Sequence, residues 1–268
     1  MQFTRLSVHD EGPVCHITFN RPERANALDG QSWQELRAAM ERLDRTRQLR
    51  VAVLHGAGRH FCSGIDHALL NELRPNGEFP GRAADRIRQR ILEIQDCVTT
   101  IETVRKPVIA AIHGACIGGG LEVAAACDIR LCAQDTRFCL KEVDLGIVAD
   151  VGALQRLPNL IGHGRARQLA LTARTMQADE ALRIGLVTEV CPDVGSLLST
   201  AGELAHALAA KSPLAVQGTK EVMVRSTLAA TRSSLAFQAA VNTGILFSPD
   251  LEEAMSAARE KRPAVFDD

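Results

Sequence analysis

The chain has 268 residues, a formal net charge of -1 and 3% aromatic residues, with no tyrosine. This length supports a substantial core in one or two domains. The near-neutral charge and the scarcity of aromatic rings argue against nucleic acid or an acidic membrane surface as a partner.

The N-terminal half alternates between short apolar strands and helices. Strands are expected at Val14–Phe19 and at Val51–Leu54, and the second is followed by a loop over residues 55–64. Between the two strands, Asp29 is a suitable N-cap for a helix that runs to about Leu43.

A second helix is expected to begin near Asp66. Residues 74–82 are rich in turn formers and are expected to be mobile. A long helix follows, and its apolar residues form one buried stripe. The stripe consists of Ile87, Ile91, Ile94, Val98 and Ile101.

Pro107 opens the next expected strand, Val108–Ile112, and another strand is expected over Asp128–Cys132. Beyond Gly152 the pattern becomes mostly helical, with a short helix over Ala178–Gly185 and a strand over Leu186–Val190. Ser212-Pro213 is typical of a helix start within the helical C-terminal part. Strands that alternate with helices, followed by a helical region, predict an α/β fold.

The segment between Pro107 and Gly152 also carries the strongest chemical signal. Gly118-Gly119-Gly120 precedes an apolar segment with Glu122 in its expected first helical turn, and Glu142 and Asp150 follow in a loop-like region. Glycine lets backbone N–H groups approach a ligand closely, and a helix N-terminus favours negative charge. Three carboxyl groups beside such a site indicate proton transfer next to a stabilised oxyanion.

Cysteines and histidines give no metal or disulfide signal. The eight cysteines contain no CxxC pair and several lie in apolar runs, so we expect buried, reduced thiols and a reducing compartment. His55, His60 and His67 stand near Asp66 with irregular loop spacing, so we expect no metal site.

Targeting signals are also not recognised. No apolar run approaches the ~20 residues that span a bilayer. The N-terminal residues lack a signal-peptide core, and the terminal VFDD carries no peroxisomal tripeptide. We therefore expect a cytoplasmic protein without a membrane partner.

Several segments resemble the crotonase (enoyl-CoA hydratase/isomerase) superfamily. They are NRPERANALD at 20–29, FCSGID at 61–66, HGACIGGGLEVAAACDIR at 113–130, KEVDLGIVADVGALQRLP at 141–158 and REKRPAVF at 259–266. Each segment alone is a weak signal, but their order and spacing cover essentially the whole chain. The segment at 141–158 is most similar to dienoyl-CoA isomerases, which convert 3,5-dienoyl-CoA into 2,4-dienoyl-CoA.

The resemblance implies a crotonase (ClpP/crotonase-like) fold, in which ββα units form a spiral. It predicts a core with the acyl-CoA site over residues 1–195 and a helical region over residues 196–268 for trimerisation and closure of the CoA site. It implies a homotrimer or a hexamer built from two trimers. The expected ligand is an acyl-CoA substrate whose coenzyme A is part of the substrate, so no separate cofactor is expected.

The resemblance also implies roles for single residues. Ser63 and Gly119 would supply two backbone N–H donors for the thioester oxygen. Glu142 would abstract the proton at C2 and Asp150 would donate one at C6. At Glu122 the chain departs from the isomerases, which usually have aspartate there, so that Glu122 and Glu142 reproduce the acid pair of a 2-enoyl-CoA hydratase.

For coenzyme A, the resemblance implies contacts from three groups of residues. Arg24, Ala25 and Ala27 would lie near the nucleotide end, Ile65 and Asp66 beside the adenine and pantetheine, and Lys261 near a phosphate. Solvated surface charge is the alternative for Arg24 and Lys261.

Other readings of the acids and glycines stay open at this point. The Gly triplet can serve only to pack a strand against a helix, and Glu142 can be a solvated carboxylate beside Lys141. Asp150 can cap a helix that begins near Gly152, and Glu122 can favour its own helix N-terminus. A non-catalytic protein that binds acyl-CoA or RNA is the alternative from another class.

Overall fold

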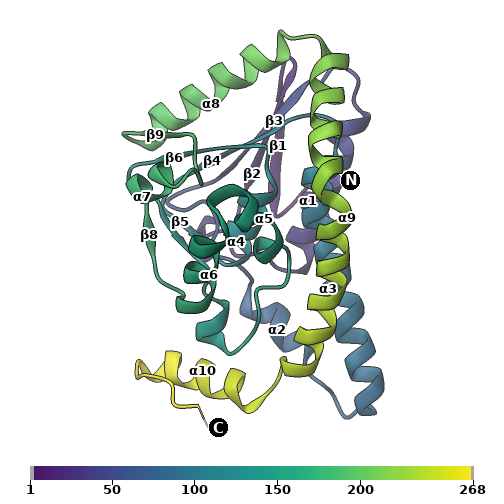
Figure 1. Cartoon of the computed structure of the whole chain (residues 1–268), viewed down its shortest axis with the longest axis vertical. Coiled ribbons are helices and arrows are strands. Elements are labelled where there is room, and N and C mark those ends of the chain that lie inside the picture. The colour runs from purple at the N-terminus through teal and green to yellow at the C-terminus, as the bar shows by residue number, and fades with distance from the viewer. Residues whose placement is uncertain (1–2, 267–268) are drawn as a thin grey trace.

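The computed structural model describes residues 3–266 as strands that alternate with helices, followed by a helical C-terminal region (Figure 1). The strands are β1 (Leu6–Glu11), β2 (Val14–Phe19), β3 (Val51–Gly56), β4 (Val108–Ile112), β5 (Ala115–Ile117), β6 (Ile129–Ala133), β7 (Arg137–Cys139), β8 (Met176–Gln177) and β9 (Glu189–Cys191). The longer helices are α1 (Gly30–Arg45), α3 (Pro80–Thr103), α8 (Val194–Ala209), α9 (Pro213–Ile245) and α10 (Pro249–Glu260). The shorter helices are α2 (His67–Leu73), α4 (Gly119–Ala126), α5 (Ala153–Ile161), α6 (His163–Thr172) and α7 (Ala178–Arg183), with 3₁₀ turns η1 (Pro22–Arg24) and η2 (Glu142–Leu145).

The larger sheet has the strand order β1-β2-β3-β4-β6-β9. β1 pairs antiparallel with β2, and the pairs that follow are parallel. Parallel strands are usually covered on both faces, and these strands are. One face packs against α1, α3 and α4, and the other face packs against α8.

The smaller sheet, β5-β7-β8, positions the chemistry. β5 and β7 pair in parallel, so their carboxyl ends lie side by side. β5 leads into Gly118 and α4, whereas β7 leads into η2, and the Gly118 N–H donates to the Cys139 carbonyl at 2.8 Å. Glu122 and Glu142 are thereby carried to the same edge of one sheet.

Most predicted elements are confirmed. The strands at Val14–Phe19 and Val108–Ile112 have the expected bounds, and Asp29 caps α1 by accepting from the Ser32 N–H at 2.8 Å. Asp66 caps α2 and Ser212 caps α9. The eight cysteines are all free and buried.

Some bounds differ for local reasons. The strand expected at Leu186–Val190 begins only at Glu189, because the Leu186 and Val187 N–H groups bond to the Ala181 carbonyl at the end of α7. The turn-rich stretch 74–82 is partly helical, because α3 begins with Pro80, a favourable first residue of a helix. Its mobility stays a prediction.

The division at residue 195 also stays a prediction. α8 lies almost entirely beyond this division, yet it packs Leu197, Ala201 and Ala205 on the larger sheet. α9 packs against α3, and α10 packs against η2. Within residues 3–266, no helix combines the length and the apolar character needed to cross a bilayer.

Candidate active site

Glu122, Glu142 and Asp150 line one small cavity of about 50 Å³. The rest of its wall is mostly apolar and comes from α1, α2, α3, α4 and α9 and from the loops before α2 and between η2 and α5. It consists of Trp33, Ile65, Leu70, Leu73, Ile91, Ile94, Gly119, Ile147, Val151, Asn242 and Leu246. The three acids predicted from the sequence are therefore brought together in an apolar environment, which favours the neutral form of a carboxyl group.

Glu142 is half-buried in η2 and faces the glycine triplet. A Cβ atom at Gly118 would lie 2.7 Å from its Oε1, and Gly118 has a φ of +50°, so only glycine fits there without strain. Lys141 pairs with Asp144 and leaves Glu142 free of an ion pair with its neighbour. Among residues 3–266, Glu142 Oε2 is buried without a hydrogen-bond partner. Burial and the nearby Asp150 raise the pKa of Glu142 to about 7.

Glu122 is a buried acid on α4 that stabilises the start of another helix. Its Oε1 accepts from the N–H groups of Val151, Gly152 and Ala153 at 3.1, 3.0 and 3.1 Å. N–H groups at the start of a helix have no partner inside the helix, and a negative group is favourable there. Burial, followed by the charges of Glu142 and Asp150, raises the pKa of Glu122 well above its usual value, and the N–H groups of Ala153 and Val151 oppose this rise.

We expect Glu122 to contribute to stability through this acceptor. Glu122→Gln keeps an oxygen at the three N–H groups, whereas Glu122→Met leaves them buried and unpaired. The free energy of unfolding should be at least about 2 kcal/mol lower for the Met variant than for the Gln variant. Urea denaturation of the two variants measures the difference. Equal stabilities would show that the three hydrogen bonds contribute little.

Asp150 follows the same loop, just before α5. It does not cap that helix: the N-cap is Gly152, which makes no side-chain cap bond, and the helix N–H groups are occupied by Glu122. The carboxyl of Asp150 accepts instead from Asn242 Nδ2 on α9. Burial raises the pKa of Asp150 to about 6, and the bond from Asn242 works in the opposite direction.

Ser63 is a correction to the predicted pair of oxyanion donors. Its N–H already donates to the Ala25 carbonyl at 3.0 Å and is therefore engaged within the protein. On geometric grounds the N–H of Ile65 is the better candidate for this donor. Leu28 and Ile65 form a parallel bridge, in which the Leu28 N–H donates to the Gly64 carbonyl and the Leu28 carbonyl accepts from the Asp66 N–H. Successive N–H groups of an extended chain point to alternate sides, so the N–H of Ile65 points away from Leu28.

Gly119 stands opposite that N–H and is the first residue of α4. A Cβ atom on Gly119 would lie 3.7 Å from the Ile65 nitrogen, and both residues line the cavity. The N–H of a first helical residue has no partner inside the helix. Ile65 and Gly119 thus form a pair of backbone donors beside Glu122 and Glu142.

Of the segments predicted to hold coenzyme A, the loops around residues 24–27 and 65–66 lie together, whereas Lys261 lies at the end of α10. The loop with Arg24, Ala25 and Ala27 is tied to the 63–66 segment through the Ala25 carbonyl and Leu28. Asp66 forms an ion pair with Arg21 at 2.9 Å, so it organises this loop from within. Arg24 is exposed at the end of η1, and Lys261 is exposed at the end of α10. Their contacts with coenzyme A stay predictions.

Sequence reasoning missed Arg21 and three buried amides, Gln95, Gln238 and Asn242. Arg21 bridges Asp29 and Asp66. Gln95 lies beside Ile91 and Ile94 on the predicted apolar stripe of α3, and a polar residue on such a stripe was a usable signal. On α9 the apolar pattern is weak, and no comparable signal marked Gln238 or Asn242.

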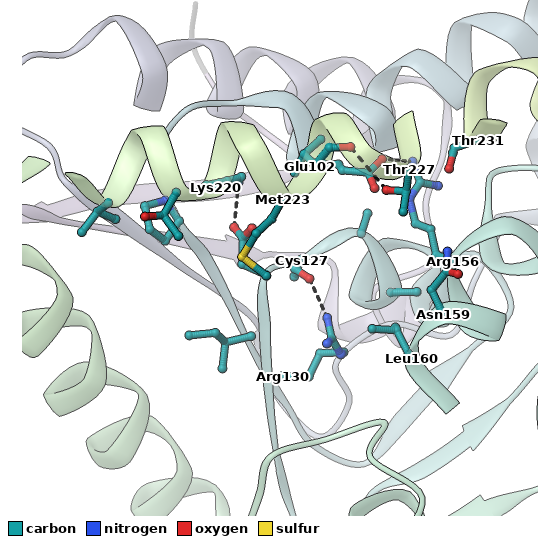
Figure 2. Close-up of a pocket in the computed structure, with 18 of the residues that line it drawn as sticks. Glu102, Cys127, Arg130, Arg156, Asn159, Leu160, Lys220, Met223, Thr227 and Thr231 are labelled. Carbon is teal, nitrogen blue, oxygen red and sulfur yellow. Dashed lines mark hydrogen bonds and ion pairs between the residues drawn. The ribbon is translucent and has the colours of Figure 1, made fainter. Parts of the chain in front are cut away.

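A second and larger hollow lies between α9 and the α4–β6 region (Figure 2). It measures about 570 Å³ and is lined mainly by apolar atoms. Its polar groups are paired at the base: Lys220 with Asp128 at 2.6 Å, and Arg156 with Glu102 at 2.9 Å. None of the three clustered acids lines this hollow.

Comparisons with known proteins identify the family of the chain. Residues 9–268 match the family model described as enoyl-CoA hydratase/isomerase. A peroxisomal Delta(3,5)-Delta(2,4)-dienoyl-CoA isomerase of Arabidopsis thaliana is 44% identical over 96% of this chain and 93% of its own. A mitochondrial protein of the same name from Mus musculus is 44% identical over 93% of this chain and 77% of its own.

More distant relatives carry other names. A short-chain-enoyl-CoA hydratase of Clostridium acetobutylicum is 34% identical over 98% of this chain and 97% of its own. The solved structure of an enoyl-CoA hydratase from Mycobacterium avium subsp. paratuberculosis superposes with a TM-score of 0.87, at 28% identity over the full length of both chains. The fold, the acid cluster and these matches agree: the chain belongs to the enoyl-CoA hydratase/isomerase, or crotonase, family.

Proposed function

We propose that this protein isomerises 3,5-dienoyl-CoA to 2,4-dienoyl-CoA in fatty-acid β-oxidation. The observation that carries the proposal is Asp150, an acid of raised pKa that shares one apolar cavity with Glu142. Moving a proton from C2 to C6 spans several bonds, and two separate carboxyl groups can serve the two ends. The dienoyl-CoA isomerases at 44% identity support the same assignment.

In this mechanism Glu142, in its ionised form, takes a proton from C2 of the 3,5-dienoyl thioester. The electron pair moves into a dienolate whose charge develops on the thioester oxygen. The N–H groups of Ile65 and Gly119 donate to that oxygen and lower the barrier. Asp150 gives its proton to C6, the double bonds settle at C2 and C4, and proton exchange with solvent then restores both acids.

The cavity as it stands measures about 50 Å³, which is too small for an acyl chain. Binding of an acyl chain therefore requires the surrounding helices to move apart. The apolar residues that α2, α3 and α9 contribute, among them Leu73, Ile91 and Leu246, are the side chains that an acyl tail would meet.

Hydration of 2-enoyl-CoA is the second candidate, because Glu122 and Glu142 line the same cavity. In that reaction one carboxylate activates water and the other handles the proton at C2. The three N–H bonds engage Glu122 Oε1, so this oxygen is less available to take a proton from water, and we place hydration second.

The test is an ultraviolet assay of the purified protein with 3,5-octadienoyl-CoA and, separately, 2-octenoyl-CoA. Growth of the conjugated 2,4-dienoyl absorbance, with slower loss of the 2-enoyl signal, is the expected result. Loss of the 2-enoyl signal alone would establish a hydratase instead. Turnover of neither substrate, with acyl-CoA still bound, would point to a non-catalytic binder.

We expect Gly119 to contribute its backbone N–H to this reaction. Gly119→Pro removes the donor at the first residue of α4, a position where proline is tolerated. The loss of one oxyanion donor should lower kcat by about 10²–10³-fold. Gly119→Ala is the matched control, because it keeps the N–H and adds a Cβ that meets Trp33 at 3.4 Å. Similar kcat values for the two variants would argue against the donor role.

Assembly into a homotrimer or a hexamer is part of the proposal. Exposed apolar side chains along α9, namely Leu214, Val222, Met223 and Phe237, support an interface on this helix, and Met223 also lines the hollow of Figure 2. Sedimentation velocity distinguishes these assemblies from a monomer.

A cytoplasmic location is likewise proposed, although the names of two relatives state peroxisomal and mitochondrial locations.

A further inference from the structure

Three buried amide side chains converge on the segment that carries Asp150. Gln95 lies on α3, and Gln238 and Asn242 lie on α9; their exposed fractions are 3%, 5% and 1%. A buried amide costs free energy unless it is hydrogen-bonded. Each of these amides finds its partner within Val148–Asp150, so the segment is held from two helices at once.

Two of the amides hold this segment only through its backbone. Gln95 Nε2 donates to the Asp150 carbonyl at 2.7 Å and to the Leu235 carbonyl at 3.0 Å, which ties α3, α9 and the segment together. Gln238 Nε2 donates to the Ala149 carbonyl. Neither side chain bonds to the carboxyl group of Asp150 in these contacts.

Asn242 is different, because it contacts both the backbone and the carboxyl group. Its Oδ1 accepts from the Val148 N–H at 3.2 Å, and its Nδ2 donates to Asp150 Oδ2. A backbone N–H can only donate, so the Val148 bond fixes which end of the amide is the oxygen. Asp150 Oδ2 is consequently an acceptor, and a proton on Asp150 must occupy Oδ1.

We propose that Asn242 is a positioning residue for the acid Asp150: it holds Oδ2 so that the transferable proton sits on Oδ1, and it stabilises the carboxylate left after transfer. This inference rests on the proposed isomerase function. Asn242 and Asp150 line the same cavity, so the substrate meets the acid in this fixed orientation.

The effect of Asn242 on the pKa of Asp150 can be distinguished from the effects of the charged groups nearby. Glu122 on α4 and Glu142 in η2 are the titratable groups that face it. Arg156 on α5 donates to the Val151 carbonyl and pairs with Glu102 on α3, whereas the amides from α3 and α9 are neutral. Burial raises the pKa of Asp150, and the Asn242 bond opposes it. Removal of this bond should therefore raise the pKa of Asp150 further.

The experiment compares Asn242→Leu with Gln238→Leu. Each variant removes one buried amide of α9 from the same segment, but only the first loses a bond to the carboxyl. Infrared difference spectra recorded against pH, with the Asp150 band assigned by its loss in Asp150→Asn, should give a pKa of Asp150 about 1 unit or more higher in Asn242→Leu. Gln238→Leu should leave that pKa unchanged.

Activity gives a second readout. For Asn242→Leu we expect about a 10-fold lower kcat, together with a pH optimum displaced upward by about half the spectroscopic shift, because the optimum lies midway between two apparent pKa values. An unchanged pKa of Asp150 in Asn242→Leu, or an equal shift in Gln238→Leu, would overturn the inference. A wild-type protein without isomerase activity would overturn the proposed function instead, and the infrared shift would still report on the contact.

Discussion

Asp150→Asn should lower kcat for dienoyl-CoA isomerisation by about 10²–10⁴-fold, the range that a positioned general acid contributes. The asparagine has the same shape and still accepts from Asn242 at its oxygen, so the segment before α5 keeps its hydrogen bonds. It carries no proton for C6. The dienolate can then form but is not converted into the conjugated product, and the growth of 2,4-dienoyl absorbance measures the loss.

The control for Asp150→Asn is Asp144→Asn. Asp144 is an exposed acid of η2 that pairs with Lys141 and lies outside the cavity wall, so its loss should leave the rate within a factor of two or so. Any hydration of 2-octenoyl-CoA should survive in Asp150→Asn, because that reaction uses Glu122 and Glu142. A full isomerase rate in Asp150→Asn would remove Asp150 from the mechanism.

Local patterns in the sequence predicted the elements that carry the site. The apolar run Val108–Ile112 and the Gly triplet were sufficient to place Glu122 in the first turn of a helix. The stripe on α3 predicted its buried face, because the 3.6-residue period is a property of the helix alone. β1 was missed, because four of its six residues are polar and the strand lies at the edge of the sheet.

Contacts between distant segments could not be predicted in the same way. The bond of Ser63 to Ala25 depends on how the 20–29 loop folds over the 61–66 loop, and this displaces the proposed oxyanion donor to Ile65. The structural role expected for Glu122 was at the N-terminus of its own helix, α4. Its carboxylate instead stabilises the N-terminus of α5 across the cavity. Asn242 lies 92 residues from Asp150 in the chain, and only the folded path of α9 brings them together.

Glu142→Gln is expected to lower kcat by about 10²–10⁴-fold for isomerisation and for any hydration, because both reactions need this group to handle the proton at C2. The amide keeps the shape of the side chain beside Gly118 but cannot accept that proton. Glu142→Asp should retain more activity than the Gln variant, although its carboxylate is withdrawn by about 1.5 Å, a displacement that can cost about 10²-fold. A Gln variant within ten-fold of the wild type would exclude Glu142 as the base.

The dependence of the wild-type rate on pH follows from the same two acids. Glu142 must be ionised, so activity rises with pH, and Asp150 must be protonated, so activity falls as pH increases further. Burial places the pKa of Asp150 at about 6 and that of Glu142 at about 7, and because the groups interact, the two apparent values belong to the pair. We therefore expect kcat/KM to peak between about pH 6 and pH 7. In Glu142→Gln the decline on the acid side should disappear from the residual rate, because the proposed base no longer titrates. A residual rate that still falls below pH 6 would assign the base to another carboxylate of the cavity, such as Glu122.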